Sequence, residues 1–275
     1  MTGKYKSVPV ENLVSEAEYL SKQGVRELLL IAQDLSYYGK DIYGKNKLSE
    51  LTGLISAIDN IEWIRLHYLY PSNVQYDLAD VMLNIPKVCK YLDIPLQHIS
   101  DPVLKRMRRR VTRSQIESII EHFRKRVGGI SLRTTMMVGF PGETEADFEE
   151  LKKFIIDAKF ERLGVFSYSH EEGTFAARKY EDNIPGEVKQ ARAGELMEIQ
   201  RGISAELNNK KIGMIYKVII DRKEGNKYVG RTEFDSPEVD GEVYISSGPE
   251  LETGSFYQVK ITGADEYDLY GHVLK

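Results

Sequence analysis

The sequence is poor in cysteine and has no long apolar run. Its only cysteine is Cys89, so an internal disulfide framework is excluded, and we expect a cytoplasmic protein in a reducing compartment. The same count excludes a metal cluster held by cysteines of these residues alone. No apolar stretch approaches the length of a membrane helix, and the first residues carry no signal-peptide core, so no membrane partner is expected.

The composition is that of an ordinary globular protein, with 41% hydrophobic and 29% charged residues in a chain of 275. A chain of this length can form more than one domain. The net charge of −4 is unevenly distributed. The last part of the chain, from Lys210 onward, is acidic, whereas the stretch LKRMRRRVTR from Leu104 to Arg113 is basic. A basic run is as often the solvated face of a helix as a binding surface.

Apolar periodicity predicts helices and strands in alternation, which is typical of a parallel sheet or barrel. The predicted strands cover residues 27–33, 63–70, 90–97, 132–139 and 162–169. The pattern opens on a helix, so we expect a partial (β/α) barrel that lacks its first strand. After residue 208 the period changes to two, which predicts a small antiparallel β-barrel. The expected domains are therefore residues 1–208 and 209–275.

Polar side chains gather where the predicted strands end. They are Gln33, Asp34, Gln97, His98, Arg133 and Thr135, together with the segments 139–143 and 169–172. Each one alone reads as a helix cap or a turn residue, and a lone His98 is more often structural than catalytic. Because the carboxyl ends of parallel strands form ligand sites, the whole set predicts a small-molecule site. We find no zinc spacing, nucleophile elbow or triad, and so predict no catalytic residue or metal ligand here.

The stretch TTMMVGFPGETEADFEEL predicts a strand, a glycine-rich loop and a helix, an arrangement that often holds phosphates. A phosphate loop needs Gly-Lys-Ser/Thr, and this loop has Gly142, Glu143 and Thr144 instead. A glutamate in that place repels a triphosphate. We therefore expect a ligand that is less anionic or positively charged.

Four segments then point to a family: LIAQDLSYYG, VGFPGETEADFEELKKF, YSHEEGTFAA, and FDSPEVDGEVYI with DEYDLYG. Together they resemble the radical S-adenosylmethionine methylthiotransferases over essentially the whole chain. KYLDIPLQHISDPVLKRMRRRVT and RTTMMVGFPGET resemble the RimO branch, which modifies an aspartate β-carbon of the twelfth protein of the small ribosomal subunit. The sister branch acts on adenosine in tRNA and usually has an aspartate where this chain has Thr135.

The resemblance implies a partial barrel followed by a TRAM domain, in agreement with the periodicity. It implies S-adenosylmethionine contacts at Gln97, Arg133, Gly139, Pro141 and Glu143, with Gln33 and Asp34 lining the site. It also implies a reductant protein, and a TRAM domain that grips the substrate. With nine Lys/Arg and twelve Asp/Glu from Lys210 to Lys275, a net of −3, that domain favours a basic ribosomal protein over RNA, so tRNA is not expected.

One departure from the family is large. The family holds one 4Fe–4S cluster with a Cys-x3-Cys-x2-Cys motif and an auxiliary cluster with three further cysteines of an N-terminal domain, whereas this chain has only Cys89. TGKYKSVPVENL resembles the segment that follows the third cluster cysteine. We therefore expect a C-terminal fragment that binds no cluster and is inactive by itself, with Cys89 as buried packing.

Three alternatives stay open at this stage. A tRNA-modifying enzyme of the same family would bind tRNA in preference to the ribosomal protein. A non-catalytic ribosome-binding module would bind the ribosomal protein without affinity for S-adenosylmethionine. An unrelated barrel enzyme such as an aldolase is disfavoured by the TRAM-like segment at the C-terminal end.

Overall fold

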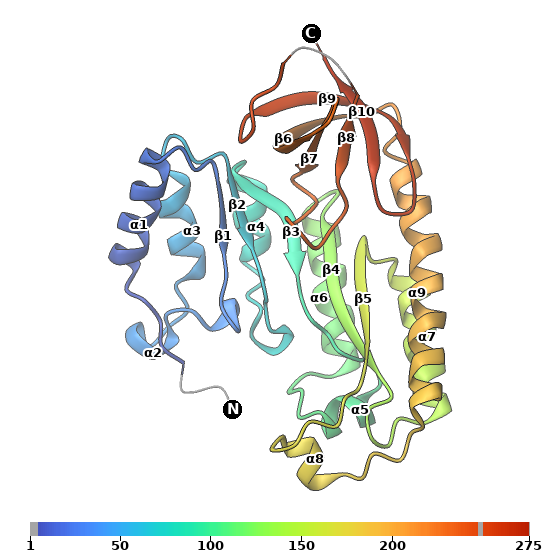
Figure 1. Cartoon of the computed structure of the whole chain (residues 1–275). Helices are drawn as coiled ribbons and strands as arrows, with labels where there is room; N and C mark the ends of the chain where they lie inside the picture. The colour runs from blue at the N-terminus through green and yellow to red at the C-terminus, as the bar shows by residue number, and fades with distance from the viewer. Residues whose placement is uncertain (1–4, 247–249, 275) are drawn as a thin grey trace.

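The computed structural model describes residues 5–246 and 250–274, and its centre is one parallel sheet of five strands (Figure 1). The strands follow one another in chain order, and each neighbouring pair is parallel. Their bounds are β1 (Glu27–Leu30), β2 (Trp63–Leu66), β3 (Val88–Asp93), β4 (Ser131–Val138) and β5 (Arg162–Ser167). This confirms the predicted partial barrel of five strands. Strand β1 forms one edge of the sheet.

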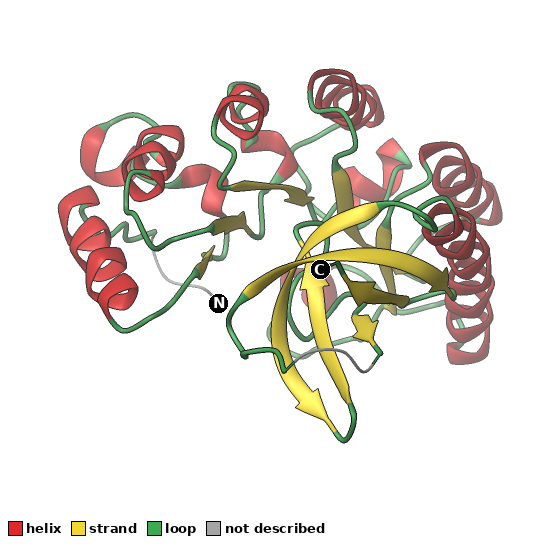
Figure 2. Cartoon of the chain, turned by 90° about the horizontal axis from the view of Figure 1, so that it is seen from above, coloured by secondary structure: helices red, strands yellow, loops and turns green. Residues whose placement is uncertain are grey.

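Helices cover the outer side of the sheet, and Figure 2 shows them as an arc around it. Their bounds are α1 (Val10–Lys22), η1 (Leu35–Tyr37), α2 (Lys40–Tyr43), α3 (Leu48–Ser56), η2 (Pro71–Asn73), α4 (Leu78–Asn84), α5 (Asp101–Arg106), α6 (Arg113–Arg126), α7 (Glu145–Ala158), α8 (Phe175–Lys179) and α9 (Gly186–Asn209). Capping boxes at Thr112 and Thr144 fix the starts of α6 and α7. None of these helices is long and apolar enough to cross a membrane.

Strand β4 shows how the sheet acquires two different faces. Its side chains alternate, so that Leu132, Met136 and Val138 are buried in the core under the helices. Arg133 and its alternate neighbours are half-buried, because they point to the opposite, concave face. This inner face has no helix layer, and it is therefore the surface where a ligand can reach the sheet.

Several elements end earlier than the sequence predicts. Strands β1, β2, β3 and β5 stop at Leu30, Leu66, Asp93 and Ser167, and helix α5 stops at Arg106. The reason for two of these ends is visible in the backbone. Tyr68 and Arg108 have φ angles of 56° and 58°, in the left-handed region, which continues neither a strand nor a helix.

A closed barrel of five strands follows α9, in the order β10-β8-β7-β6-β9. Its strands are β6 (Ile215–Glu224), β7 (Lys227–Thr232), β8 (Val243–Ile245), β9 (Phe256–Ala264) and β10 (Leu269–Val273). The predicted small barrel is thus confirmed. It sits at the amino ends of the core strands (Figure 1). There Ile219 and Phe256 pack on the inner-face residues Trp63, Cys89 and Tyr91, and Cys89 is buried as expected.

A buried ion network also joins the barrel to the sheet. The Glu27 carboxylate at the start of β1 accepts hydrogen bonds from Arg65 on β2, at 3.0 and 3.1 Å, and from Arg231 on β7, at 2.7 Å. The Arg65 side chain is fully buried and also donates to the backbone oxygen of Glu233. Burial raises the pKa of Glu27, but the hydrogen bonds and charges of Arg231 and Arg65 outweigh it and lower the pKa overall.

A second set of polar contacts joins the barrel to the other half of the sheet. Arg162 at the start of β5 binds Asp235, and Arg133 lies 3.0 Å from Asp93 and 3.3 Å from Asp240. The Tyr91 hydroxyl donates to Asp240 at 2.7 Å. These charges are removed from water at the amino ends of the strands and are paired across the two domains. The barrel therefore completes the core sheet at this end.

We expect Arg65→Met to destabilise the folded chain by about 3–5 kcal/mol, because it leaves a buried carboxylate with one fewer partner. Arg222→Met is the matched control, since Arg222 pairs with Glu224 and Glu242 on the exposed surface of the barrel. Arg222→Met should lower the free energy of unfolding by only about 0–1 kcal/mol. Urea unfolding of both variants measures the difference. Equal losses would show that the network does not stabilise the joint between the domains.

Candidate functional site

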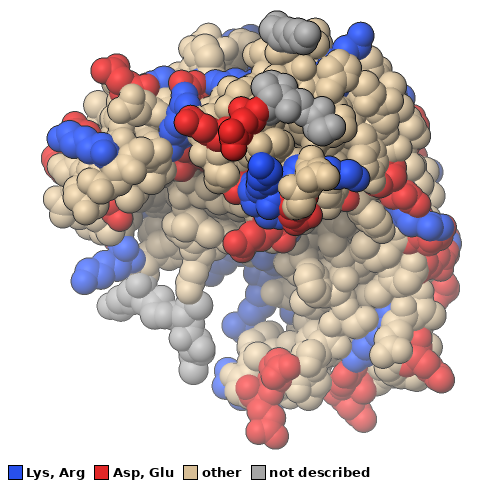
Figure 3. Space-filling model, turned by 45° about the horizontal axis from the view of Figure 1, so that its top comes forward, with Lys and Arg blue, Asp and Glu red and all other residues tan. Residues whose placement is uncertain are grey.

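The inner face stays open at the carboxyl ends of the strands. Figure 3 shows the molecule hollowed on this side, with Lys and Arg side chains inside the hollow. A groove of about 700 Å³ lies there, lined by Tyr5, Ile31, Ala32, Gln33 and Tyr68. Ile31 is 62% exposed, and Phe166 on β5 is 61% exposed. Exposed apolar side chains beside polar ones on a concave face are typical of a small-molecule site.

Two residues at this end of the sheet hold a backbone conformation that side chains rarely adopt. Tyr68 follows β2 with a φ of 56°, and Gln97 follows β3 with a φ of 73°. Hydrogen bonds fix both: Tyr68 O accepts from Leu35 N at 3.0 Å, and Gln97 O accepts from Met137 N at 2.7 Å. Strained residues of this kind cluster at ligand sites, and here two occur on adjacent strand ends.

The side chains of Gln33 and Gln97 have free amide groups. Neither side chain forms a hydrogen bond within residues 5–246 and 250–274. Gln33 is exposed, and Gln97 is half-buried. Each amide offers two donors and an acceptor. The structure thus places two of the predicted contact residues where a ligand with carboxylate, amine or hydroxyl groups could bind them.

The loop from Gly139 to Glu143 differs from the expectation. The Glu143 carboxylate is buried and points inward, where it accepts from Gly139 N at 2.8 Å and from Arg192 on α9 at 2.7 Å. His98 Nε2 lies 3.6 Å from it. Arg192 therefore already compensates the charge that the sequence analysis assigned to a cationic ligand. Glu143 shapes the loop.

His98, Pro141 and Gly139 also have structural surroundings. His98 is fully buried, and its Nδ1 accepts from Ser100 N at 3.0 Å. The Pro141 carbonyl accepts from Arg106 Nε at 2.8 Å. Gly139 has a φ of 73°, and a Cβ added there would overlap Lys189 Cγ and lie 2.8 Å from Lys189 Cδ. The glycine is needed because α9 packs closely against the loop.

Asp34 is a local support rather than an open ligand. Its carboxylate accepts from Asn73 Nδ2 at 2.9 Å, from Tyr70 N at 3.2 Å and from the Ser36 hydroxyl. Its backbone oxygen accepts from the Tyr5 hydroxyl at 3.1 Å. These bonds hold the ends of β1 and β2 together beside the groove.

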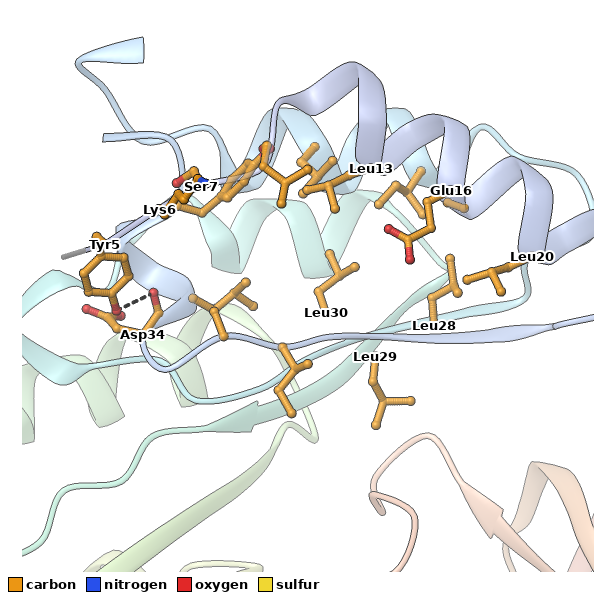
Figure 4. Close-up of a pocket in the computed structure, with 18 residues that line it drawn as sticks. Tyr5, Lys6, Ser7, Leu13, Glu16, Leu20, Leu28, Leu29, Leu30 and Asp34 are labelled. Atoms are coloured by element: carbon orange, nitrogen blue, oxygen red, sulfur yellow. Dashed lines mark hydrogen bonds between the residues drawn. The ribbon is translucent and has the colours of Figure 1, made fainter. Parts of the chain in front are cut away.

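A second cavity, of about 380 Å³, lies on the other side of β1 (Figure 4). Its walls are mostly apolar and come from α1, β1 and α3, and include Leu13, Leu20 and Leu30. Figure 4 shows the Glu16 carboxylate among these side chains. The cavity follows the edge of the sheet and shares Tyr5, Ile31 and Ala32 with the groove that contains Gln33.

Arg133 is separated from the loop that the resemblance groups with it. It lies near the start of β4, in ion pairs with Asp93 and Asp240, whereas Gly139 follows the other end of the strand. The polar layer around Arg133 was missed by sequence reasoning. Burial and the charges of Arg65 and Arg133 lower the pKa of His67 to about 4, and burial raises the pKa of Asp93. The signal was an aspartate inside the apolar strand KYLDIPLQ.

The described residues do not fit an iron–sulfur cluster. They hold no group of three or more His, Cys, Asp or Glu side chains that could bind a metal ion. Cys89 is fully buried at the opposite end of the inner face from the groove, and burial raises the pKa of its thiol to about 12. A thiol in that state is a poor metal ligand.

We expect Gly139→Ala to destabilise the chain by about 2–4 kcal/mol, from left-handed strain and from overlap with Lys189. Gly129→Ala is the control, because Gly129 has a φ of 74° with no atom within 4 Å of an added Cβ. Gly129→Ala should lower the free energy of unfolding by about 1 kcal/mol. Thermal unfolding of both variants gives the comparison, and equal losses would contradict the packing role of the loop.

Comparisons with known proteins agree with this geometry. The family model of the radical SAM superfamily matches residues 1–155, and that of the TRAM domain matches residues 212–274. The coproporphyrinogen III oxidase HemN of Escherichia coli shares the fold with a TM-score of 0.55 and 15% sequence identity. That match covers 82% of this chain and 60% of HemN.

Curated relatives are much closer in sequence. The ribosomal protein uS12 methylthiotransferase RimO of Bacteroides thetaiotaomicron is 59% identical over 275 residues, which is 100% of this chain and 63% of the relative. The protein of the same name from Porphyromonas gingivalis is 55% identical and is covered to 64%. The chain thus spans less than two thirds of the length of these relatives. Because the superfamily model covers more than half of its residues, the chain belongs to the radical SAM superfamily.

Proposed function

We propose that the chain is the S-adenosylmethionine-binding and TRAM part of a methylthiotransferase that modifies ribosomal protein uS12. The observation that carries the proposal is the identity of 54–59% to relatives of that name over the whole chain. The family resemblance makes the target an aspartate β-carbon. Residues 1–208 act as the cofactor-binding core and residues 209–275 as the substrate-binding domain. Such a protein works in the cytoplasm, as its single cysteine suits.

The cofactor of this proposal is S-adenosylmethionine, which supplies the methyl group. Gln33 and Gln97 bind it directly through their free amides, and Tyr68 lines the groove beside Gln33. Gly139, Pro141 and Glu143 act indirectly, because their contacts with Lys189, Arg106 and Arg192 fix the loop beside Gln97. Asp34 supports the groove through Tyr5 and Asn73.

Arg133 has a different place in the proposal. Its side chain is 19% exposed and is held by Asp93 and Asp240 on the inner face. From there it orients whatever reaches the floor of the hollow, whether cofactor or substrate. Two 4Fe–4S clusters belong to the proposed whole enzyme, together with a reductant protein. Because Cys89 is the only cysteine of these residues, the cluster ligands come from polypeptide outside them.

The TRAM barrel is the proposed contact for the basic ribosomal protein. Its core-facing carboxylates Asp221 and Asp235 are engaged by Arg231 and Arg162. Exposed carboxylates that form no ion pair within the described residues are Glu238, Glu250 and Glu252. These support an electrostatic contact with a basic protein. A tRNA substrate is the second candidate within the family, and preferential binding of tRNA to the barrel would favour it.

Isothermal titration of the chain with S-adenosylmethionine tests the site. We expect Gln97→Ala to weaken binding about tenfold, because it removes a hydrogen bond of about 1.5 kcal/mol. Gln258→Ala is the control, since Gln258 is exposed on β9 of the barrel. No binding by the parent chain, or equal effects of the two variants, would contradict the proposed cofactor site.

Anaerobic incubation with ferrous iron and sulfide tests the cluster statement. After desalting we expect no stoichiometric iron on the chain, because its one thiol is buried and protonated. Cys89→Ser should behave in the same way. A cluster retained by the parent chain and lost in Cys89→Ser would show that these residues hold iron after all.

A further inference from the structure

The arginines of the chain fall into two groups. Arginines outside the segment 105–110, Arg178 excepted, each form an ion pair with a carboxylate. Arg106, Arg108, Arg109 and Arg110 form none with any residue that the structure describes. In an acidic protein this is a local excess of uncompensated positive charge. We call Lys105 and these four residues the arginine rim.

The rim is built in a defined conformation. Helix α5 ends at Arg106, and Arg108 occupies the left-handed position after it, where glycine is the usual residue. Arg109 N donates to Leu104 O at 2.9 Å, which closes the turn. The turn therefore presents arginine side chains at a position where the backbone geometry alone would favour a glycine.

Arg109 anchors the rim and is itself incompletely satisfied. Its guanidinium lies 4.2 Å from the centre of the Tyr70 ring, and Nη2 donates to Pro95 O. Its Nε is buried and has no hydrogen-bond partner. Burial lowers the pKa of Arg109, and the charges of Tyr70 and Asp34 offset the lost hydration only in part. An anion in contact with Arg109 would provide a direct counter-charge for its guanidinium.

A groove of about 720 Å³ runs along the rim, lined by Lys105, Arg108, Arg109 and Arg110 and by the start of α6. The polar side chains at the start of α6 are already engaged, because Thr112 and Gln115 form a capping box. The acid in the groove, Asp101, accepts from Arg113 N at 2.7 Å. The N-terminal end of α6 adds the positive end of its dipole to the groove.

The rim lies at the carboxyl end of the sheet, the end that carries the candidate site (Figure 1). Helices α5 and α8 lie side by side at the end of the molecule opposite the barrel (Figure 1). Arg106 and Arg108 pack there on the rings of Tyr180 and Phe175. Arg178, the other unpaired arginine, lies on the same helix α8. The uncompensated arginines thus gather at the end of the molecule away from the barrel (Figure 1).

We propose that the arginine rim binds the phosphate backbone of RNA. The three arginines and one lysine that line the groove favour phosphates, because the planar guanidinium binds phosphate oxygens in a bidentate manner. An open groove lined by several cations suits a chain of evenly spaced phosphates. The identity of the RNA rests on the proposed function: a uS12-modifying enzyme would meet the ribosomal RNA that surrounds its target.

The test is the binding of a short fluorescein-labelled RNA hairpin, followed by fluorescence anisotropy at several salt concentrations. The test variant is Arg108→Glu/Arg110→Glu. The matched control is Lys125→Glu/Lys153→Glu, which changes the net charge equally on exposed lysines of α6 and α7. We expect the rim variant to bind at least tenfold more weakly than the control, and its salt slope to fall by about 1–2.

Circular dichroism melting of both variants shows whether they fold as the parent does. If Arg108→Glu/Arg110→Glu unfolds, Arg108→Gln/Arg110→Gln takes its place with the same expectation and about half the effect. No RNA binding by the parent chain overturns the proposal. Equal losses in rim and control variants overturn it too, as does competition by a poly-glutamate peptide that displaces the RNA.

The outcome is separable from that of the proposed function. RNA binding that depends on the rim, without affinity for S-adenosylmethionine, would support the rim proposal and contradict the proposed cofactor site. Affinity for S-adenosylmethionine that depends on Gln97, without RNA binding, would do the reverse.

Discussion

The structure depends on the buried pairing of Glu27 with Arg65 and Arg231. An open sheet with helices on one side leaves its inner face without a second layer, and here that face carries charged residues. Such charges need either water or a counter-charge. The barrel covers the amino end and supplies Arg231 as a counter-charge, at 2.7 Å from Glu27. Removing one partner from such a buried set destabilises a protein more than replacing the whole set by apolar residues does. We therefore expect the two domains to fold as one unit.

Closing one end of the inner face defines the function of the other. At the amino end the inward-facing charges described above are paired, as Arg162 and Asp235 illustrate. At the carboxyl end Gln33 and Gln97 have free amides, and Tyr68 holds a strained conformation. Two side-chain amides without hydrogen-bond partners among the described residues therefore lie at the open end of the hollow. A ligand bound there meets unsatisfied groups, whereas at the barrel end it would have to break ion pairs.

Local chemistry explains which features could be predicted from the sequence. Strand and helix order follow from periodicity, and the start of α7 follows from Thr144 and Asp147, three residues apart. The surroundings of Glu143 could not be predicted, because its partner Arg192 lies on a helix 49 residues later. The left-handed turn at Arg108 was equally hidden, since nothing in RMRRR marks it as a glycine-like position. Gln33 and Gln97 were predicted as site residues because they follow apolar strands, although the structure ends those strands earlier, at Leu30 and Asp93.

The central claim is that one end of the inner face is a closed joint and the other a ligand site. Hydrogen–deuterium exchange of the chain with and without S-adenosylmethionine tests it most directly. The account predicts slower exchange at the ends of β1, β2 and β3, around Gln33, Tyr68 and Gln97, with no change where Arg231 meets Glu27. Protection confined to the barrel, or unchanged exchange at those strand ends with the ligand bound, would contradict it.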